Sequence, residues 1–188
     1  MFKFNIICDM NKIKLKDKEF QIAIHYDSIY QSIKQIAASI NHDFQDKETP
    51  VFLSILNGAF MFTADLFKEL RIDAHLSFVK FASYQGMNST GNVKQLIGLN
   101  EDLKEKNIIV LEDIVDSGLT ISKITEQLGH YNPKELKIAT LLLKPDVYKG
   151  KIPLDYVGME IPNEFIVGYG LDYDGLGRNY KNIYKVVS

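Results

Sequence analysis

Short apolar runs alternate along this chain with helix-like segments, and this alternation restricts the fold more than any other feature. Residues 28–40 carry apolar side chains at helical spacing, and 60–70 and 120–128 also have helical patterns. The apolar runs of strand length are 51–56, 108–111 and 136–143. Strands that alternate with helices pair in parallel through right-handed crossovers. We therefore expect an α/β fold, with a parallel sheet flanked by helices.

The remaining segments add a long loop and a small appendage. Residues 75–81 alternate like a strand, 82–94 have the polar composition of a loop, and 95–99 are interpreted as a further strand. In the tail, short β-like runs at 156–158 and 165–169 fit a small subdomain better than another βα unit. A length of 188 residues suits one such domain.

The composition of the chain indicates its cellular compartment and the classes of partner that it could bind. The formal net charge is −2, so no general basic surface is expected to bind nucleic acid. A single cysteine, Cys8, allows no internal disulfide, which fits a reducing, cytoplasmic setting. No stretch approaches the ~20 apolar residues of a membrane helix, so no membrane partner is expected.

One segment, residues 108–120, carries most of the candidate chemistry. A buried strand ends at two adjacent carboxylates, Glu112 and Asp113, and a Ser-Gly turn then leads into a helix. Amide groups at a helix start bind phosphate well, and glycine lets the backbone come close. The carboxylates would repel a phosphate unless they face ribose hydroxyls or Mg²⁺. The segment therefore suits a ribose phosphate, with Asp116 placed between its two parts.

The structural alternative is an ordinary turn. Asp-Ser-Gly is common in turns, and Asp or Ser often caps a helix. Each piece alone would more often be structural. Four acidic or hydroxyl groups in order between a buried strand and a helix favour the functional interpretation.

Residues 111–120 resemble the phosphoribosyl pyrophosphate signature of the type I phosphoribosyltransferases. Other segments narrow the resemblance to the hypoxanthine-guanine phosphoribosyltransferases. These segments are 56–59, Ser83-Tyr84 with 89–91, Lys144 with 157–162, and 165–173 with Arg178. The resemblance implies the type I phosphoribosyltransferase fold. It implies a core at about 20–145, and a hood at about 150–180 joined by the N-terminal segment.

The resemblance assigns most of these residues to the donor, phosphoribosyl pyrophosphate. Glu112 and Asp113 would hold the ribose hydroxyls, partly through Mg²⁺. Main chain from Asp116 to Thr120, with the Ser117 and Thr120 hydroxyls, would cradle the 5′-phosphate. This cradle also contains Gly118 and Leu119, and Leu119 stands where some relatives have lysine. A cradle made of backbone tolerates that difference.

Other positions would hold the pyrophosphate. The resemblance implies that Asn57 and Gly58 offer amide groups, that Arg178 binds as a charged fork, and that Ser83 and Tyr84 close over the site. The peptide entering the Asn57-Gly58 loop can be cis in this family. Many relatives have lysine in place of Asn57, so no side-chain role is assigned there. Asp172 would bind a second Mg²⁺ and lie near the 2-position of the base.

The acceptor would be a 6-oxopurine. The resemblance implies that Asp116 faces purine N7 as the general base, that Phe165 stacks on the base, and that the main chain of Ile166 meets its edge. Lys144 would donate to the 6-oxo group. An ammonium has donors and no acceptor, so it suits a carbonyl better than an amino group. Each of these residues also has an ordinary structural or surface explanation when taken alone.

The implied activity is purine salvage. It transfers the 5-phosphoribosyl group to hypoxanthine or guanine and yields IMP or GMP and pyrophosphate, and such enzymes are commonly homodimers or homotetramers. One alternative is the same fold acting on xanthine, adenine or a pyrimidine. A second is a regulator of this fold that binds nucleotides and RNA, which the slightly acidic charge and the presence of Asp116 disfavour.

Overall fold

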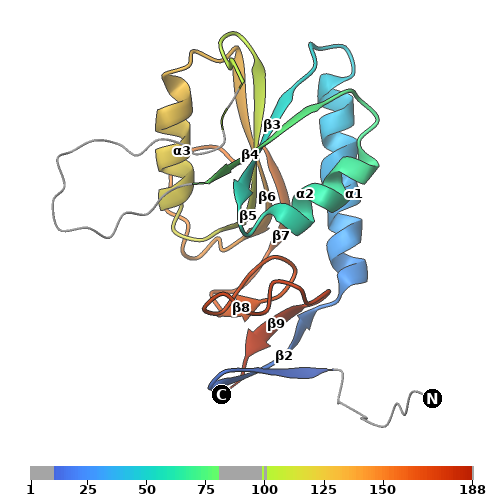
Figure 1. Ribbon diagram of the computed structural model, residues 1–188, viewed down its shortest axis with the longest axis vertical. Coiled ribbons are helices and arrows are strands. Elements are labelled where there is room, and N and C mark those ends of the chain that lie inside the picture. The colour runs from blue at the N-terminus through green and yellow to red at the C-terminus, as the bar shows by residue number, and fades with distance from the viewer. Residues whose placement is uncertain (1–10, 81–98, 100, 188) are drawn as a thin grey trace, which may run out of the picture.

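A five-stranded parallel sheet forms the centre of the molecule (Figure 1). The computed structural model describes residues 11–80, 99 and 101–187. The sheet has the order β4-β3-β5-β6-β7 and pairs in parallel throughout. Its strands are β3 (Val51–Leu56), β4 (His75–Lys80), β5 (Asn107–Val115), β6 (Glu135–Leu143) and β7 (Tyr156–Glu160). The predicted α/β class with a parallel sheet is confirmed.

Helices cover both faces of this sheet. α1 (Tyr26–Phe44) and α2 (Phe60–Glu69) lie on one face, and α3 (Leu119–Gly129) lies on the other. Side chains of β5 alternate between the faces, so that Ile109 and Leu111 pack with α1 and α2 while Ile108 and Val110 pack with α3. This two-sided burial explains why the strand sequences are continuous apolar runs.

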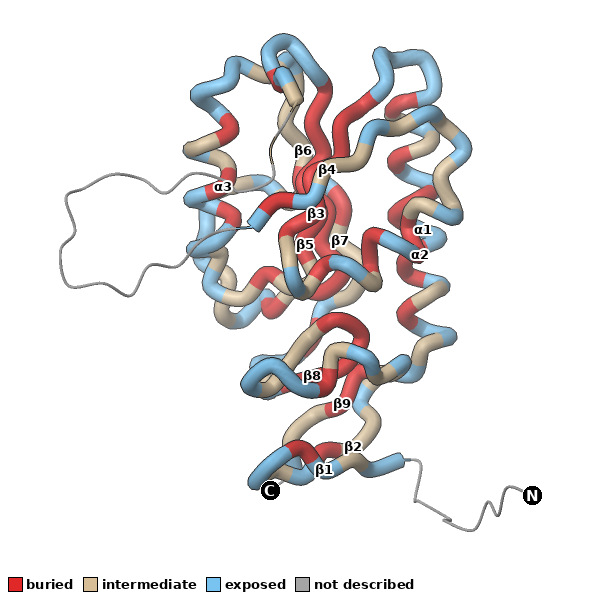
Figure 2. The backbone as a smooth tube through the Cα atoms, in the orientation of Figure 1, coloured by how far each residue is buried: buried red, intermediate tan, exposed pale blue. Residues whose placement is uncertain are grey.

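Helix α1 follows from its apolar stripe. Its buried positions are Ile29, Ser32, Ile33, Ile36, Ala37, Ile40 and Phe44. They recur every three or four residues and form one face of the helix, which packs on the sheet. Figure 2 shows this pattern as buried positions on the strands and on the sides of the helices that face them. No helix in the described parts of the chain is long and apolar enough to cross a membrane.

A second, antiparallel sheet forms the hood. It has the order β1-β2-β9-β8 and lies below the parallel strands in Figure 1. Its strands are β1 (Lys12–Leu15), β2 (Lys18–Ile24), β8 (Ile166–Val167) and β9 (Ile183–Val186). Phe20 is fully buried there with Val167 and Tyr184. Residues 12–24 therefore lie in the hood, and the central sheet starts with β3.

Two sequence predictions need correction. Residues 156–158 do not belong to the small subdomain, because β7 pairs with β6 as the fifth strand of the central sheet. The strand predicted at 108–111 extends to Val115, because β6 continues beside it, with Leu143 opposite Val115. Glu112 and Asp113 therefore lie within β5. The strand interpreted at 95–99 falls almost wholly outside the described residues, and Leu99 itself is not in a strand.

Tyr156 ties β7 to α1, and this contact gives a stability test. Its hydroxyl donates a 2.8 Å hydrogen bond to the Asp43 carboxylate, which is the main cause that holds the pKa of Asp43 below its ordinary value. Tyr156→Phe should therefore lower the free energy of unfolding by about 1 kcal/mol at pH 7. A carboxylate whose pKa is lowered in the folded state stabilises the fold at pH values above its pKa in the unfolded chain, about 3.9. This stabilisation is lost in more acid solution. The difference between wild type and variant should shrink below about pH 4.

Urea titrations at several pH values would measure this effect. The matched control is the same substitution in an Asp43→Asn background, where the difference should not depend on pH. A pH-independent cost in the wild-type background would contradict the assignment of the hydrogen bond.

Candidate active site

The carboxyl ends of the central strands place the predicted site residues at one edge of the sheet. β3 ends next to Asn57, β5 continues into the turn that starts α3, and β6 ends next to Lys144. The peptide between Leu56 and Asn57 is cis. Ligands of open α/β sheets bind beyond this edge. The hood lies beyond the same edge (Figure 1), so that the site lies between the two sheets.

The two carboxylates of β5 differ from ordinary surface acids. Glu112 is buried, and its Oε2 has no hydrogen-bond partner among the described residues. The Asp113 carboxylate packs against Gly58 so closely that a Cβ atom there would overlap it. Burial raises the pKa of Glu112 well above its ordinary value, with a smaller contribution from Asp113. Burial also raises the pKa of Asp113 to about 6. Both groups therefore favour a cationic or hydroxyl-bearing partner.

The turn before α3 has the backbone of an anion cradle. Gly118 caps the helix with φ 81°, a conformation that side chains rarely adopt. The first amide groups of a helix lack intrahelical acceptors and so point their N–H bonds at a ligand. Ser117, Leu119 and Thr120 are exposed around this start, and Leu119 is 69% exposed. The Leu119 side chain therefore points into solvent. A leucine in place of the lysine of some relatives leaves the backbone cradle intact, because the side chain is not part of it.

Asp116 and Lys144 meet directly. Lys144 Nζ lies 3.0 Å from Asp116 Oδ2, although 28 residues separate them in sequence. The Lys144 side chain is 9% exposed, whereas the Asp116 side chain is 48% exposed. A buried ammonium needs such a partner, because an unpaired charge in the interior costs several kcal/mol. The pair offers an ammonium donor and a carboxylate acceptor side by side.

Asn163 is a second partner of Lys144 that the sequence did not indicate. Its Oδ1 accepts a 3.3 Å hydrogen bond from Lys144 Nζ. The residue follows β7, and the pairing of β7 with β6 brings this segment alongside the end of β6 next to Lys144. Because that strand was assigned to the wrong sheet, no spacing in the sequence could have identified Asn163.

The hood supplies the next group of predicted residues. Phe165 is 46% exposed, and its ring lies 5.7 Å from Tyr173 in an edge contact. Ile166 follows it as the first residue of β8 and is buried. Phe165 is therefore a surface aromatic, whereas Ile166 packs into the core with its side chain.

Arg178 and Asp172 form a charged pair in the turns between β8 and β9. Arg178 Nη2 lies 2.5 Å from Asp172 Oδ1, and Arg178 Nη1 donates to the carbonyl oxygen of Gly170 at 2.7 Å. Gly170 in turn packs against the carbonyl of Gly58, since a Cβ on Gly170 would overlap that oxygen. The structure thus brings Arg178 and Asp172 to the loop at Asn57-Gly58. Ser83 and Tyr84 lie outside the described residues.

The donor set suits Mg²⁺ that is shared with a substrate. Among the described residues, no three metal-ligating side chains come together, so there is no cage made by protein alone. Glu112 and Asp113 offer an adjacent pair, with one buried oxygen unpartnered. Mg²⁺ is commonly bound by one or two carboxylates with substrate phosphates and water. Glu112 and Asp113 therefore fit a Mg²⁺ ion that would take its remaining ligands from a substrate or from water.

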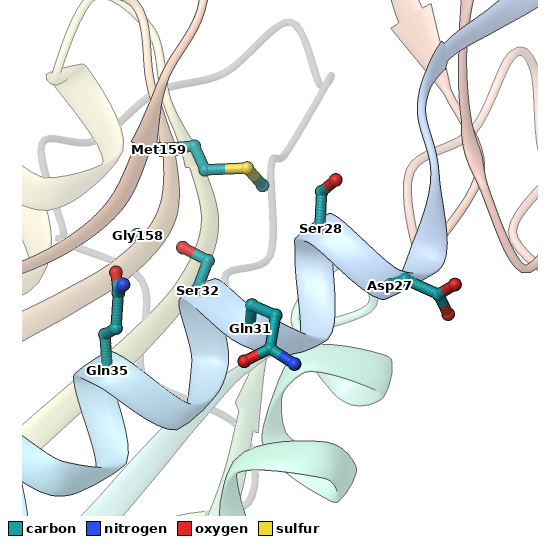
Figure 3. A pocket seen from close by; sticks show the side chains of 7 residues that line it. All are labelled: Asp27, Ser28, Gln31, Ser32, Gln35, Gly158 and Met159. Carbon is teal, nitrogen blue, oxygen red and sulfur yellow. The ribbon is translucent and has the colours of Figure 1, made fainter.

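A hollow of about 450 Å³ lies elsewhere, between α1 and β7 (Figure 3). Asp27, Ser28, Gln31, Ser32, Gln35, Gly158 and Met159 line it. Ser32 points from α1 toward Gly158 there, and its buried Oγ has no hydrogen-bond partner in the part of the chain that is described. None of the predicted site residues lines this hollow. We therefore place the candidate site at the carboxyl ends of the strands, where the charged groups converge.

Comparison with known proteins gives the same family. The sequence model of the phosphoribosyl transferase domain matches residues 25–174. The hypoxanthine phosphoribosyltransferase of Salmonella typhimurium is 39% identical, over 89% of this chain and 95% of its own. The hypoxanthine-guanine phosphoribosyltransferase of Staphylococcus epidermidis is 43% identical, over 84% and 88%.

Solved structures agree. A hypoxanthine-guanine phosphoribosyltransferase from Bacillus anthracis superposes with a TM-score of 0.80 at 37% identity, covering 89% of this chain and 97% of its own. The hypoxanthine phosphoribosyltransferase of Trypanosoma cruzi gives 0.78 at 30% identity, covering 88% and 95%. This chain belongs to the phosphoribosyltransferase family, in its hypoxanthine-guanine branch.

Proposed function

We propose that this protein transfers the 5-phosphoribosyl group of phosphoribosyl pyrophosphate to hypoxanthine or guanine in purine salvage, giving IMP or GMP and pyrophosphate. The observation that carries the proposal is the pair of Lys144 and Asp116, 3.0 Å apart at the strand ends. The names of the relatives support it.

The paired charges match one edge of a 6-oxopurine. The 6-oxo group and N7 are neighbours on that edge, and in the N7-protonated form they present an acceptor beside a donor. Lys144 donates to the oxygen, and Asp116 accepts from the N7 proton. A 6-amino group would instead turn a donor toward the ammonium, which has no acceptor to offer.

The rest of the base is held by the hood. Phe165 supplies an exposed ring for stacking, and the main chain of Ile166 meets the base edge. In this proposal the Asp172 carboxylate, which pairs with Arg178, lies near the 2-position of the base. In this proposal the main chain and water read the 2-position, so that guanine and hypoxanthine both fit.

The donor occupies the other half of the site. The backbone from Asp116 to Thr120, with the Ser117 and Thr120 hydroxyls, binds the 5′-phosphate, and Glu112 with Asp113 faces the ribose hydroxyls. The Asn57-Gly58 amides and Arg178 bind the pyrophosphate, and Ser83 with Tyr84 covers it. When bound, Mg²⁺ supplies positive charge that neutralises the departing pyrophosphate. Glu112 and Asp113 are the proposed ligands of one ion, and Asp172 is the proposed ligand of a second.

The reaction is a displacement at C1′ of the ribose. A bond forms between purine N9 and C1′, the bond from C1′ to the pyrophosphate oxygen breaks, and the configuration inverts. The N7 proton passes to the Asp116 carboxylate, so the base carries no positive charge once N9 is bonded to C1′. Arg178 stabilises charge on the leaving group, and exclusion of water prevents hydrolysis of the donor.

Assembly and location are also part of the proposal. We propose a homodimer or homotetramer from the resemblance, and a cytoplasmic location from the single cysteine.

Pyrophosphate release in parallel wells tests the substrate class. Wild-type protein would be supplied with Mg²⁺, phosphoribosyl pyrophosphate and one of hypoxanthine, guanine, xanthine or adenine. We expect release with hypoxanthine or guanine. With adenine we expect kcat/KM to be lower by roughly 10³-fold or more, because the 6-amino group and the Lys144 ammonium would be two hydrogen-bond donors facing each other. Equal use of adenine would contradict the role of Lys144. Silence with every base from protein that binds the donor would contradict the activity and favour the regulator.

Gly58→Ala tests the contact between the 57–58 loop and β5. The added methyl group would overlap the Asp113 carboxylate, and such overpacking costs about 1–3 kcal/mol. We expect the dissociation constant for phosphoribosyl pyrophosphate to rise about tenfold, measured by calorimetry with Mg²⁺. Gly129→Ala is the matched control, because a Cβ there would meet nothing within 4 Å. Equal affinity of the two variants would show that the contact does not shape the donor site.

A further inference from the structure

Asp65 is a buried carboxylate that lies outside the candidate active site. It is on α2, is 8% exposed, and accepts hydrogen bonds from two tyrosines. Tyr169 Oη lies 2.7 Å from its Oδ2, and Tyr26 Oη lies 3.1 Å from the same oxygen. Lys68 Nζ lies 2.7 Å from Oδ1. One carboxylate thus joins α2, the start of α1 and the hood.

The charges at this junction are fixed near neutral pH. Burial alone would raise the pKa of Asp65, but the hydrogen bonds from Lys68, Tyr169 and Tyr26 outweigh it and lower the pKa below its ordinary value. Burial, together with the bond to Asp65, raises the pKa of the Tyr169 hydroxyl. Tyr169 therefore donates to an ionised carboxylate, which is a stronger bond than one between neutral groups.

Tyr169 belongs to the segment that carries the proposed pyrophosphate ligands. Its backbone has φ 49°, and its N–H donates to the carbonyl oxygen of Tyr180 at 2.8 Å. The next residue, Gly170, packs against the Gly58 carbonyl and accepts the hydrogen bond from Arg178. Gly170 N–H also donates to the carbonyl oxygen of Arg178 at 3.0 Å. A shift of Tyr169 would therefore move Arg178 relative to the 57–58 loop.

We infer that Asp65 and Tyr169 are positioning residues for the pyrophosphate half of the site. Their hydrogen bond fastens the hood segment to α2, and α2 begins directly after the 57–59 loop. The bond thereby fixes the separation between Arg178 on one side and the Asn57-Gly58 amides on the other. This inference rests on the proposed function, since it presumes that these groups bind pyrophosphate.

Tyr26 provides an internal comparison. It donates to the same oxygen of Asp65, but its side chain extends from α1 and stacks on Tyr30 with ring centroids 5.6 Å apart. The Tyr26 ring also lies 6.0 Å from the Tyr169 ring, a contact that a phenylalanine would keep. Losing its hydroxyl removes a bond from the same carboxylate without releasing the segment that carries Gly170 and Arg178. If the junction only stabilises the fold, the two tyrosines should be equivalent in their effect on ligand binding.

The experiment compares Tyr169→Phe with Tyr26→Phe in the full chain. Calorimetry with Mg²⁺ would give dissociation constants for phosphoribosyl pyrophosphate and for ribose 5-phosphate, which lacks the pyrophosphate. Tyr169→Phe should weaken phosphoribosyl pyrophosphate about tenfold and ribose 5-phosphate less than about twofold. Tyr26→Phe should change both by less than about twofold. Thermal unfolding would report the stability of each variant.

Asp65→Asn is the second variant and keeps an acceptor oxygen while removing the charge. It should weaken phosphoribosyl pyrophosphate by about threefold to tenfold and again spare ribose 5-phosphate. Equal effects of Tyr169→Phe and Tyr26→Phe, or equal loss of both ligands in Tyr169→Phe, would overturn the inference while leaving the proposed function intact. Wild-type protein that binds no phosphoribosyl pyrophosphate would overturn both.

Discussion

Strand β5 runs between β3 and β6 in parallel register, with Leu53 opposite Val110 and Val110 opposite Ile138. Its first six residues are buried, and the pairing with β6 continues to Val115. This pairing brings the ends of three strands to one edge, where the 57–58 loop, the acidic pair and Lys144 meet. The site depends on it, because these residues lie far apart in the sequence and no local structure would join them.

The site combines groups that would be unfavourable without a ligand. Glu112 and Asp113 are adjacent carboxylates that burial drives toward the neutral form, and one oxygen of Glu112 has no partner among the described residues. Lys144, in contrast, is satisfied by Asp116 and Asn163. The acidic pair therefore favours a cation or hydroxyl groups, whereas Lys144 and Asp116 form a balanced pair that, in the proposed function, a purine edge joins. This difference is consistent with binding of the donor and the base in separate halves.

Sequence reasoning located the elements with strong local signals and missed those set by tertiary contacts. β3 has the predicted bounds, and Lys144 directly follows the last residue of β6, as the apolar run before it suggested. β7 was misassigned because the segment before it has no helical pattern, yet Tyr148, Ile152 and Leu154 pack that segment on the face of α3, where a helix would lie. The partnerships of Asn163 with Lys144 and of Asp65 with Tyr169 span 19 and 104 residues, and no spacing rule predicts them.

Proton transfer from the base to Asp116 is the central step of the proposed reaction, and a comparison of Asp116→Asn with wild type tests it most directly. Calorimetry would give the affinity for phosphoribosyl pyrophosphate, and rapid mixing would give the rate of IMP formation from hypoxanthine at saturating substrate. Because the backbone cradle remains, we predict donor affinity within about threefold of wild type and a turnover lower by about 10²–10⁴-fold. Unchanged turnover would contradict the role of Asp116.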